Sequence, residues 1–177
     1  MKNLILLLLI TFTLSCCNKD DDQPKTELEK LPLATQTGAN TFGCLLDGQA
    51  FIPSGGTNPL DCVYQFVNGG YYFALQGNKR DSENNYFRIG VGTINLQIAQ
   101  NHTYQLLENQ NGNATGRFYY NTLYKNTSSN HTGELKITKL DTQNKIVSGT
   151  FWFDVLHPVT NQVVKIRDGR FDMQYTE

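Results

Sequence analysis

The chain has 177 residues, with 15 basic and 16 acidic side chains and a formal net charge of −1. This balance argues against binding to nucleic acid, which relies on clustered Lys and Arg to neutralise phosphates. A chain of this length is long enough to form one domain with a hydrophobic core. The side chains for such a core are present, since 39% of the residues are hydrophobic and 11% are aromatic.

The first residues predict export. Lys2 precedes an uncharged apolar run over residues 4–14, which is shorter than the ~20 residues that a membrane-spanning helix needs. A short apolar run behind a basic start is typical of a signal peptide. We therefore expect residues 1–15 to form a signal peptide that directs export.

The end of this run resembles a bacterial lipobox, in which a peptidase cuts before a cysteine whose thiol carries a diacylglycerol. The residues are Leu14, Ser15, Cys16 and Cys17. Because a small residue precedes the cut, the resemblance implies that Cys16 is acylated, with Cys17 as the alternative. Stable anchoring needs more than one acyl chain, and a diacylglyceryl cysteine meets that need. An ordinary secretory leader is the competing interpretation.

A lysine followed by acidic residues stands directly after these cysteines, at Lys19, Asp20, Asp21 and Asp22. This resembles the lipoprotein export signal of the Bacteroidota, which implies an outer-membrane lipoprotein displayed on the cell surface. The periplasmic face is the alternative location. A solvated acidic spacer is the alternative interpretation of the charges, since such runs are commonly disordered tails.

The chain divides after the leader into a tether and a domain. Residues 16–40 hold the lipidated cysteine, the export signal and a tether, in which Pro24 and Pro32 bracket a turn or two of helix. We expect the tether to settle onto the domain near Leu33 to Gly38. Residues 41–177 are predicted to form a single β domain.

Short alternating segments separated by turns fill this domain, and no sustained helical period occurs. Asp47-Gly48 is a type I′ hairpin signal, and Gly90 and Gly92 indicate a bulge, a bend or a close backbone approach. The predicted strands cover residues 41–46, 49–52, 62–67, 71–76, 86–94, 103–107, 117–124, 133–140, 146–156, 163–166 and 170–175. About ten short strands of this kind predict an antiparallel β-sandwich, with an antiparallel β-barrel as the alternative.

Two cysteines, Cys44 and Cys62, lie in the domain. Export places them in an oxidising compartment and favours a disulfide between them. Such a bridge would stabilise the domain by ~3 kcal/mol in the chain-entropy model. The alternative is two separate buried thiols that act as small hydrophobic groups.

Three segments carry a family resemblance: LPLATQTGANTFGCLLDGQAFIPSG (residues 31–55), GELKITKLDTQNKIVSGTFWFDV (133–155) and IRDGRFDM (166–173). They resemble small lipoproteins of the Bacteroidota that carry a domain of unknown function. The resemblance implies an exported β domain. It implies no catalytic residues, because the shared segments are hairpins, glycine bends and core strands.

No motif predicts a cofactor or a metal site, since the three histidines stand apart in sequence and neither H-x-x-x-H nor C-x-x-C spacing occurs. A polysaccharide hydrolase is one alternative function, and its carboxylate pair would come from Asp154, Asp168 and Asp172. Structural ion pairing with neighbouring arginines is the stronger interpretation of these carboxylates.

Aromatic side chains that alternate with core positions carry the functional prediction. Tyr72, Tyr86, Tyr119 and Trp152 are expected on outward faces, where they suit stacking on sugar rings or contact with a protein partner. The alternative is that a second layer covers them. We therefore expect a non-enzymatic surface module that binds a glycan or an envelope protein, with a purely structural envelope protein as a further alternative.

Overall fold

The computed structural model describes residues 24–56 and 58–177. The predicted lipidation residues Cys16 and Cys17 and the predicted export signal Lys19–Asp22 lie outside these ranges. The described residues form eleven strands and no helix, which confirms the predicted all-β class. Within the described ranges, no helical segment has the length and apolarity that crossing a membrane requires.

The strands follow the predicted segments closely. They are β1 (Thr41–Leu46), β2 (Gln49–Phe51), β3 (Leu60–Val67), β4 (Gly70–Arg80), β5 (Tyr86–Ile94), β6 (His102–Leu106), β7 (Ala114–Tyr120), β8 (Leu123–Asn126), β9 (Gly133–Asp141), β10 (Ile146–Leu156) and β11 (Val163–Gln174).

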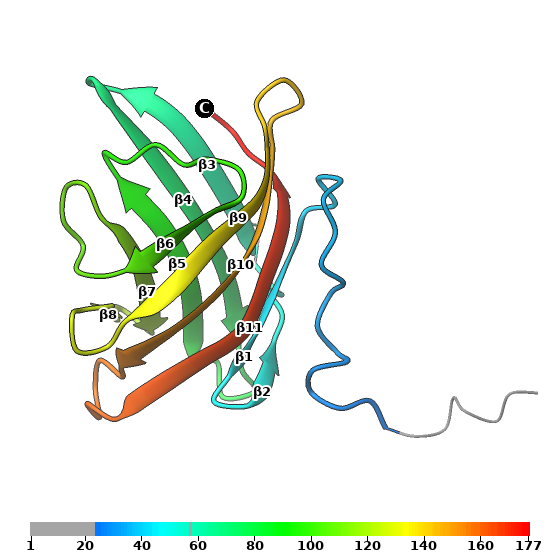
Figure 1. Cartoon of the computed structure of the whole chain (residues 1–177). Coiled ribbons are helices and arrows are strands. Elements are labelled where there is room, and N and C mark those ends of the chain that lie inside the picture. The colour runs from blue at the N-terminus through cyan, green and yellow to red at the C-terminus, as the bar shows by residue number, and fades with distance from the viewer. Residues whose placement is uncertain (1–23, 57) are drawn as a thin grey trace, which may run out of the picture.

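All eleven strands belong to one largely antiparallel sheet, in the order β2-β1-β11-β10-β9-β6-β7-β5-β4-β3, with β8 beside β7. The sheet folds over so that β9, β10 and β11 lie in front of β3, β4 and β5 (Figure 1). The rings of Phe73 on β4 and Phe171 on β11 lie 6.2 Å apart, so the inner faces of the two halves share one core. The predicted packed layers are therefore two halves of a continuous sheet.

Strand β6 joins the two halves. It pairs antiparallel with β9 over five residues, from His102 to Leu106, and Leu106 also pairs in parallel with Ala114 on β7. The strand order ends at β2 and β3, and the sheet is not closed between them. The C-terminal Thr176 instead covers part of the β3 edge, because it exchanges backbone hydrogen bonds with Cys62 and Tyr64.

Residues with positive φ set the turns. Asp47 and Gly48 have φ values of 48° and 84°, which confirms the predicted type I′ hairpin between β1 and β2. Asn121, with φ of 55°, splits the predicted strand 117–124 into β7 and β8. Asp168, with φ of 51°, lies within β11, so the predicted bend there is an irregularity inside one long strand.

The segment 24–40, which we call the strap, packs onto the outer face of β1 and β11. Leu31 is buried, and a Cβ atom at Gly43 of β1 would lie 2.6 Å from the Pro32 ring. Thr26 and Glu29 form a reciprocal capping box around a single turn. The expectation that the tether settles onto the domain near Leu33 to Gly38 is confirmed by hydrogen bonds from this segment to Asp172.

Candidate functional site

The two halves of the sheet differ in what covers their outer faces. The strap lies over the outer face of β1 and β11, whereas no other part of residues 24–56 and 58–177 forms such a layer on the outer face of β4, β5 and β7 (Figure 1). The alternation of these three strands points Phe73, Val91 and Phe118 inward, where all three are buried. Residues between them in sequence therefore face outward and form the candidate site.

Three arginines and three tyrosines alternate across this open face. Arg80 and Arg88 lie over the Tyr86 ring. The Cζ atom of Arg80 is 5.3 Å from the ring centroid, and that of Arg88 is 5.4 Å from it. Arg88 also lies 5.1 Å from the centroid of the Tyr119 ring. These contacts are of the cation–π type.

The series continues onto β7 and β8. Arg117 lies 6.0 Å from the centroid of Tyr119 and 5.0 Å from that of Tyr124. We call the whole series the Arg–Tyr ladder, and its members in spatial order are Arg80, Tyr86, Arg88, Tyr119, Arg117 and Tyr124.

Strand register places the three arginines on one diagonal of the sheet. Arg80 of β4 pairs with Tyr86 of β5, two residues before Arg88. Arg117 of β7 pairs with Gly90 of β5, two residues after Arg88. Diagonal neighbours in an antiparallel sheet have Cα atoms ~7–8 Å apart, so the arginines form a regularly spaced row.

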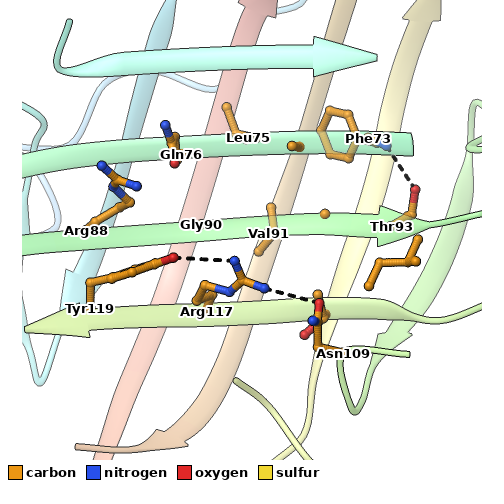
Figure 2. Close-up of a pocket in the computed structure, with 14 residues that line it drawn as sticks. Phe73, Leu75, Gln76, Arg88, Gly90, Val91, Thr93, Asn109, Arg117 and Tyr119 are labelled. Atoms are coloured by element: carbon orange, nitrogen blue, oxygen red, sulfur yellow. Dashed lines mark hydrogen bonds between the residues drawn. The ribbon is translucent and has the colours of Figure 1, made fainter. Parts of the chain in front are cut away.

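A groove begins where this row reaches β5. Gly90 and Gly92 form its floor, because neither has a side chain to fill the outer face between β4 and β7. Figure 2 shows Gly90 on β5 between these two strands. A Cβ at Gly92 would lie 2.4 Å from the Phe73 carbonyl oxygen, and one at Gly90 would lie 3.0 Å from that of Leu75. The predicted close backbone approach is therefore the role that the structure gives these glycines, which lie in an unbroken β4–β5 ladder.

The rim of this glycine groove is polar and basic, and its volume is about 180 Å³. The side chains around it come from β4, β5, β7 and the loop before β7. They are Ala74, Gln76, Arg88, Asn109, Thr115, Arg117 and Tyr119. Figure 2 labels Gln76, Arg88, Asn109, Arg117 and Tyr119 among them.

Amide side chains hold both groove arginines at Nε. Arg88 Nε donates to Asn78 Oδ1 at 2.9 Å, and Arg117 Nε donates to Asn126 Oδ1 at 2.7 Å. Arg117 also donates to Asn109 Oδ1 at 3.2 Å (Figure 2). These contacts fix the guanidinium planes, and among the described residues Arg88 uses only Nε for hydrogen bonds, which leaves its terminal nitrogens without a protein partner there.

Among the described residues, no carboxylate lines the groove. Glu108 precedes the rim residue Asn109, but its carboxylate accepts the Ser129 backbone N–H at 2.6 Å. This hydrogen bond lowers the pKa of Glu108. The Glu108 side chain does not belong to the groove lining. The groove consequently has a net positive lining in a chain whose overall charge is slightly negative.

The four predicted aromatics fall at two places. Tyr86 and Tyr119 are half-buried members of the Arg–Tyr ladder, and Tyr72 lies on the same face of β4, opposite Ile94. Trp152 lies on β10 in the other half, where Nε1 donates to Glu134 Oε2 at 3.3 Å and Arg167 lies over its ring.

The arginines of the ladder were not predicted from the sequence. Their signal is the spacing Y-x-R in Tyr86 to Arg88 and R-x-Y in Arg117 to Tyr119, which puts a cation and a ring on the same face of a strand. Only the β5–β7 register, however, brings these two pairs together.

The carboxylates of the hydrolase alternative are used in other contacts. Asp154 pairs with Arg167 at 2.6 Å, and Asp168 lies exposed at the irregularity in β11. Asp172 is fully buried beneath the strap, where its Oδ1 accepts from Ser148 Oγ at 2.8 Å. These three residues therefore provide no pair of free carboxylates across a cleft.

Cys44 and Cys62 are free, buried thiols, in place of the disulfide that the sequence favours. Cys44 lies on β1, which pairs with β2 and β11, whereas Cys62 lies on β3, which pairs with β4. The two cysteines therefore do not lie opposite each other in any ladder. Burial raises the pKa of both thiols well above the usual range, which makes them unreactive in the folded state.

In the described part of the chain, no three His, Cys, Asp or Glu side chains gather as a group that could hold a metal ion. Residues 88–173 match the model of a family described as a domain of unknown function (DUF6252). No curated protein and no solved structure matches the chain. The matched segment runs from Arg88 in β5 to Met173 in β11 and includes Arg117 and Tyr119. It agrees with the resemblance to a domain of unknown function and carries no assigned chemistry.

Proposed function

We propose that this chain is a lipid-anchored binding module of the cell envelope, and that it holds an oligosaccharide in the glycine groove. The observation that carries the proposal is an open sheet face with a groove of side-chain-free backbone, surrounded by fixed hydrogen-bonding groups. Ligand sites in general are concave and carry a small number of placed polar groups that fix the orientation of the ligand.

The size and the polarity of the groove favour a sugar. A volume of about 180 Å³ is below the ~300–1,000 Å³ of sites that enclose a small molecule, so the groove takes one ring of a longer ligand. Gln76 and Asn109 offer amide groups of the kind that exchange hydrogen bonds with sugar hydroxyls. The larger exposed apolar side chains, such as Phe66 and Leu123, lie away from the groove lining.

The anchor is proposed from the leader sequence, with acylation at Cys16 and Cys17 as the alternative. The strap would connect this anchor to the outer face of the β1 and β11 half, which leaves the groove half free. The signal at Lys19, Asp20, Asp21 and Asp22 supports display on the outer surface of the outer membrane. Membership of a Bacteroidota lipoprotein family is part of the same proposal.

Labelling with palmitate tests the anchor. A Cys16→Ala variant should lose the label, whereas a Cys17→Ala variant should keep it. Protease treatment of intact cells tests the location, and degradation of the domain in whole cells is the expected result. A domain protected until the cells are lysed would contradict surface display.

Blocking the groove tests the binding function. Ala74 is exposed at the rim, so Ala74→Trp should fill the groove without disturbing the core and should abolish binding on an oligosaccharide array. Thr150→Trp is the matched control, because Thr150 is an exposed outward residue of β10 in the other half. Equal binding by both variants would refute the groove as the site.

A further inference from the structure

We propose that the ligand of the glycine groove is an acidic oligosaccharide, whose carboxylates bind the diagonal arginine row of Arg80, Arg88 and Arg117. This inference rests on the proposed function, since it specifies the class of sugar that the groove takes. It follows from four properties of the Arg–Tyr ladder: occupied ring faces, fixed guanidinium planes, missing counter-charges and regular spacing.

The tyrosine rings are already stacked. Tyr86 has Arg80 and Arg88 over its ring, and Tyr119 is contacted by two arginines in the same way. A sugar that stacks directly on an aromatic side chain needs an open ring face. The ladder instead presents the N–H edges of its arginines, so its recognition chemistry is charge and hydrogen-bond donation.

The guanidinium groups are held in place before any ligand arrives. Arg88 is fixed at Nε by Asn78 and by the Tyr86 hydroxyl, at 2.9 Å and 2.8 Å. An arginine fork with its terminal nitrogens free matches the two oxygens of a carboxylate. Because the side chain is already ordered, binding costs less conformational entropy than it would for a mobile arginine.

None of the three arginines in the row forms an ion pair with a carboxylate in the described part of the chain. The four ion pairs recorded there involve Lys30, Lys139, Lys145 and Arg167, and none of the three ladder arginines. Arg167 shows the contrast, because it also lies over an aromatic ring but pairs with Asp154. An anionic ligand would give the ladder arginines the negatively charged partner that Asp154 gives Arg167.

The spacing favours a ligand with repeated charge. Successive arginines are diagonal neighbours, so their Cα atoms repeat at ~7–8 Å along a line that ends beside Gly90. A single anion would engage one or two of them. A chain of uronic acid units can present carboxylates along the row while one ring lies over the glycine floor.

Asp61 borders the groove, and its negative charge can be used to test the sign of the charge on the ligand. Asp61 is exposed on the neighbouring strand β3, and its Oδ2 accepts from Gln76 Nε2 at 3.4 Å. Gln76 belongs to the groove rim, so the Asp61 charge should repel an acidic ligand. An Asp61→Asn variant should bind the acidic ligand more tightly and leave binding of a neutral sugar unchanged.

Calorimetric titration of the full chain in detergent, with trigalacturonate as the acidic probe and maltotriose as the neutral one, tests the inference. We expect trigalacturonate to bind at least tenfold more tightly, with an affinity that falls as salt is raised. Arg88→Gln and Arg117→Gln should each weaken trigalacturonate binding about tenfold or more, since each removes a charge-assisted contact. Arg167→Gln is the matched control and should leave binding unchanged.

The outcomes separate this inference from the proposed function. Equal binding of both probes, blocked by Ala74→Trp, would overturn the acidic class and leave the oligosaccharide groove in place. Binding of neither probe, and of no oligosaccharide on the array, would overturn both. If thermal unfolding shows that a glutamine variant is destabilised, Asp61→Asn decides the matter: unchanged affinity for trigalacturonate would refute the inference.

Discussion

The carboxylate of Asp172 should fasten the strap to the sheet, and its removal should be costly. Its two oxygens accept six hydrogen bonds, five of them from the strap: the hydroxyls of Thr35 and Thr37 and the backbone N–H groups of Thr37, Gly38 and Ala39. The side chain is fully buried. Asp172→Asn would turn an NH2 group toward at least one of these backbone donors in either orientation of the amide.

The expected cost follows from these contacts. A hydrogen bond to a charged group contributes ~1.5–3 kcal/mol, and an unpaired buried donor costs ~1–3 kcal/mol. We therefore expect Asp172→Asn to destabilise the protein by about 3 kcal/mol, which lowers the Tm by roughly 6–12 °C for a chain of this size. Asp168→Asn is the control, because Asp168 is exposed and Asn tolerates its positive φ. Equal Tm values for Asp172→Asn and the unaltered protein would refute this account.

The same carboxylate predicts a dependence on pH. Burial alone would raise the pKa of Asp172, but the hydrogen bonds from Thr35, Thr37, Ser148 and Gly38 outweigh burial and lower it. A depressed pKa in the folded state stabilises the protein above the unfolded pKa of roughly 4, and this contribution is lost as the pH falls through the folded-state pKa. Chemical unfolding between pH 6 and pH 2 should therefore show a steeper acid-induced loss for the unaltered protein than for Asp172→Asn.

Three further predictions follow from packing and from the ladder. Alkylation followed by mass spectrometry should label Cys44 and Cys62 in the unfolded, unreduced protein and neither in the folded protein; a disulfide-linked peptide would contradict the free thiols. Gly92→Ala should lower the stability by ~1–3 kcal/mol in urea unfolding, because its Cβ would overlap the Phe73 carbonyl oxygen. Tyr119→Leu should weaken trigalacturonate binding several-fold, whereas Tyr119→Phe, which keeps the ring between its two arginines, should bind nearly as well.

Local patterns predicted most of the strands, because alternation and turn residues act over a few positions. The Asp47-Gly48 hairpin and the alternation in residues 133–140 and 146–156 are examples. Pairing between distant strands has no such local signal. That β1 pairs with β11, and that β6 joins two halves of one sheet, depends on contacts between segments far apart in sequence.

The candidate site could be predicted in part for the same reason. Alternation placed Tyr86 and Tyr119 on an outward face. The proximity of Arg88 and Arg117 in one row, however, depends on the β5–β7 register. Asp172 shows the opposite case, since a mid-strand acid on an outward position is buried because the strap folds over it. The sequence predicted that the tether settles onto the domain, but the strand pattern has no signal for which residues the tether covers.

The most direct test of the central claim observes the arginine side chains during binding. In an NMR titration with trigalacturonate, the Nε–Hε resonances of Arg88 and Arg117 should shift together and saturate at one affinity, while that of Arg167 stays in place. Shifts of equal size at all three arginines, or trigalacturonate binding that leaves Arg88 and Arg117 unchanged, would contradict the account.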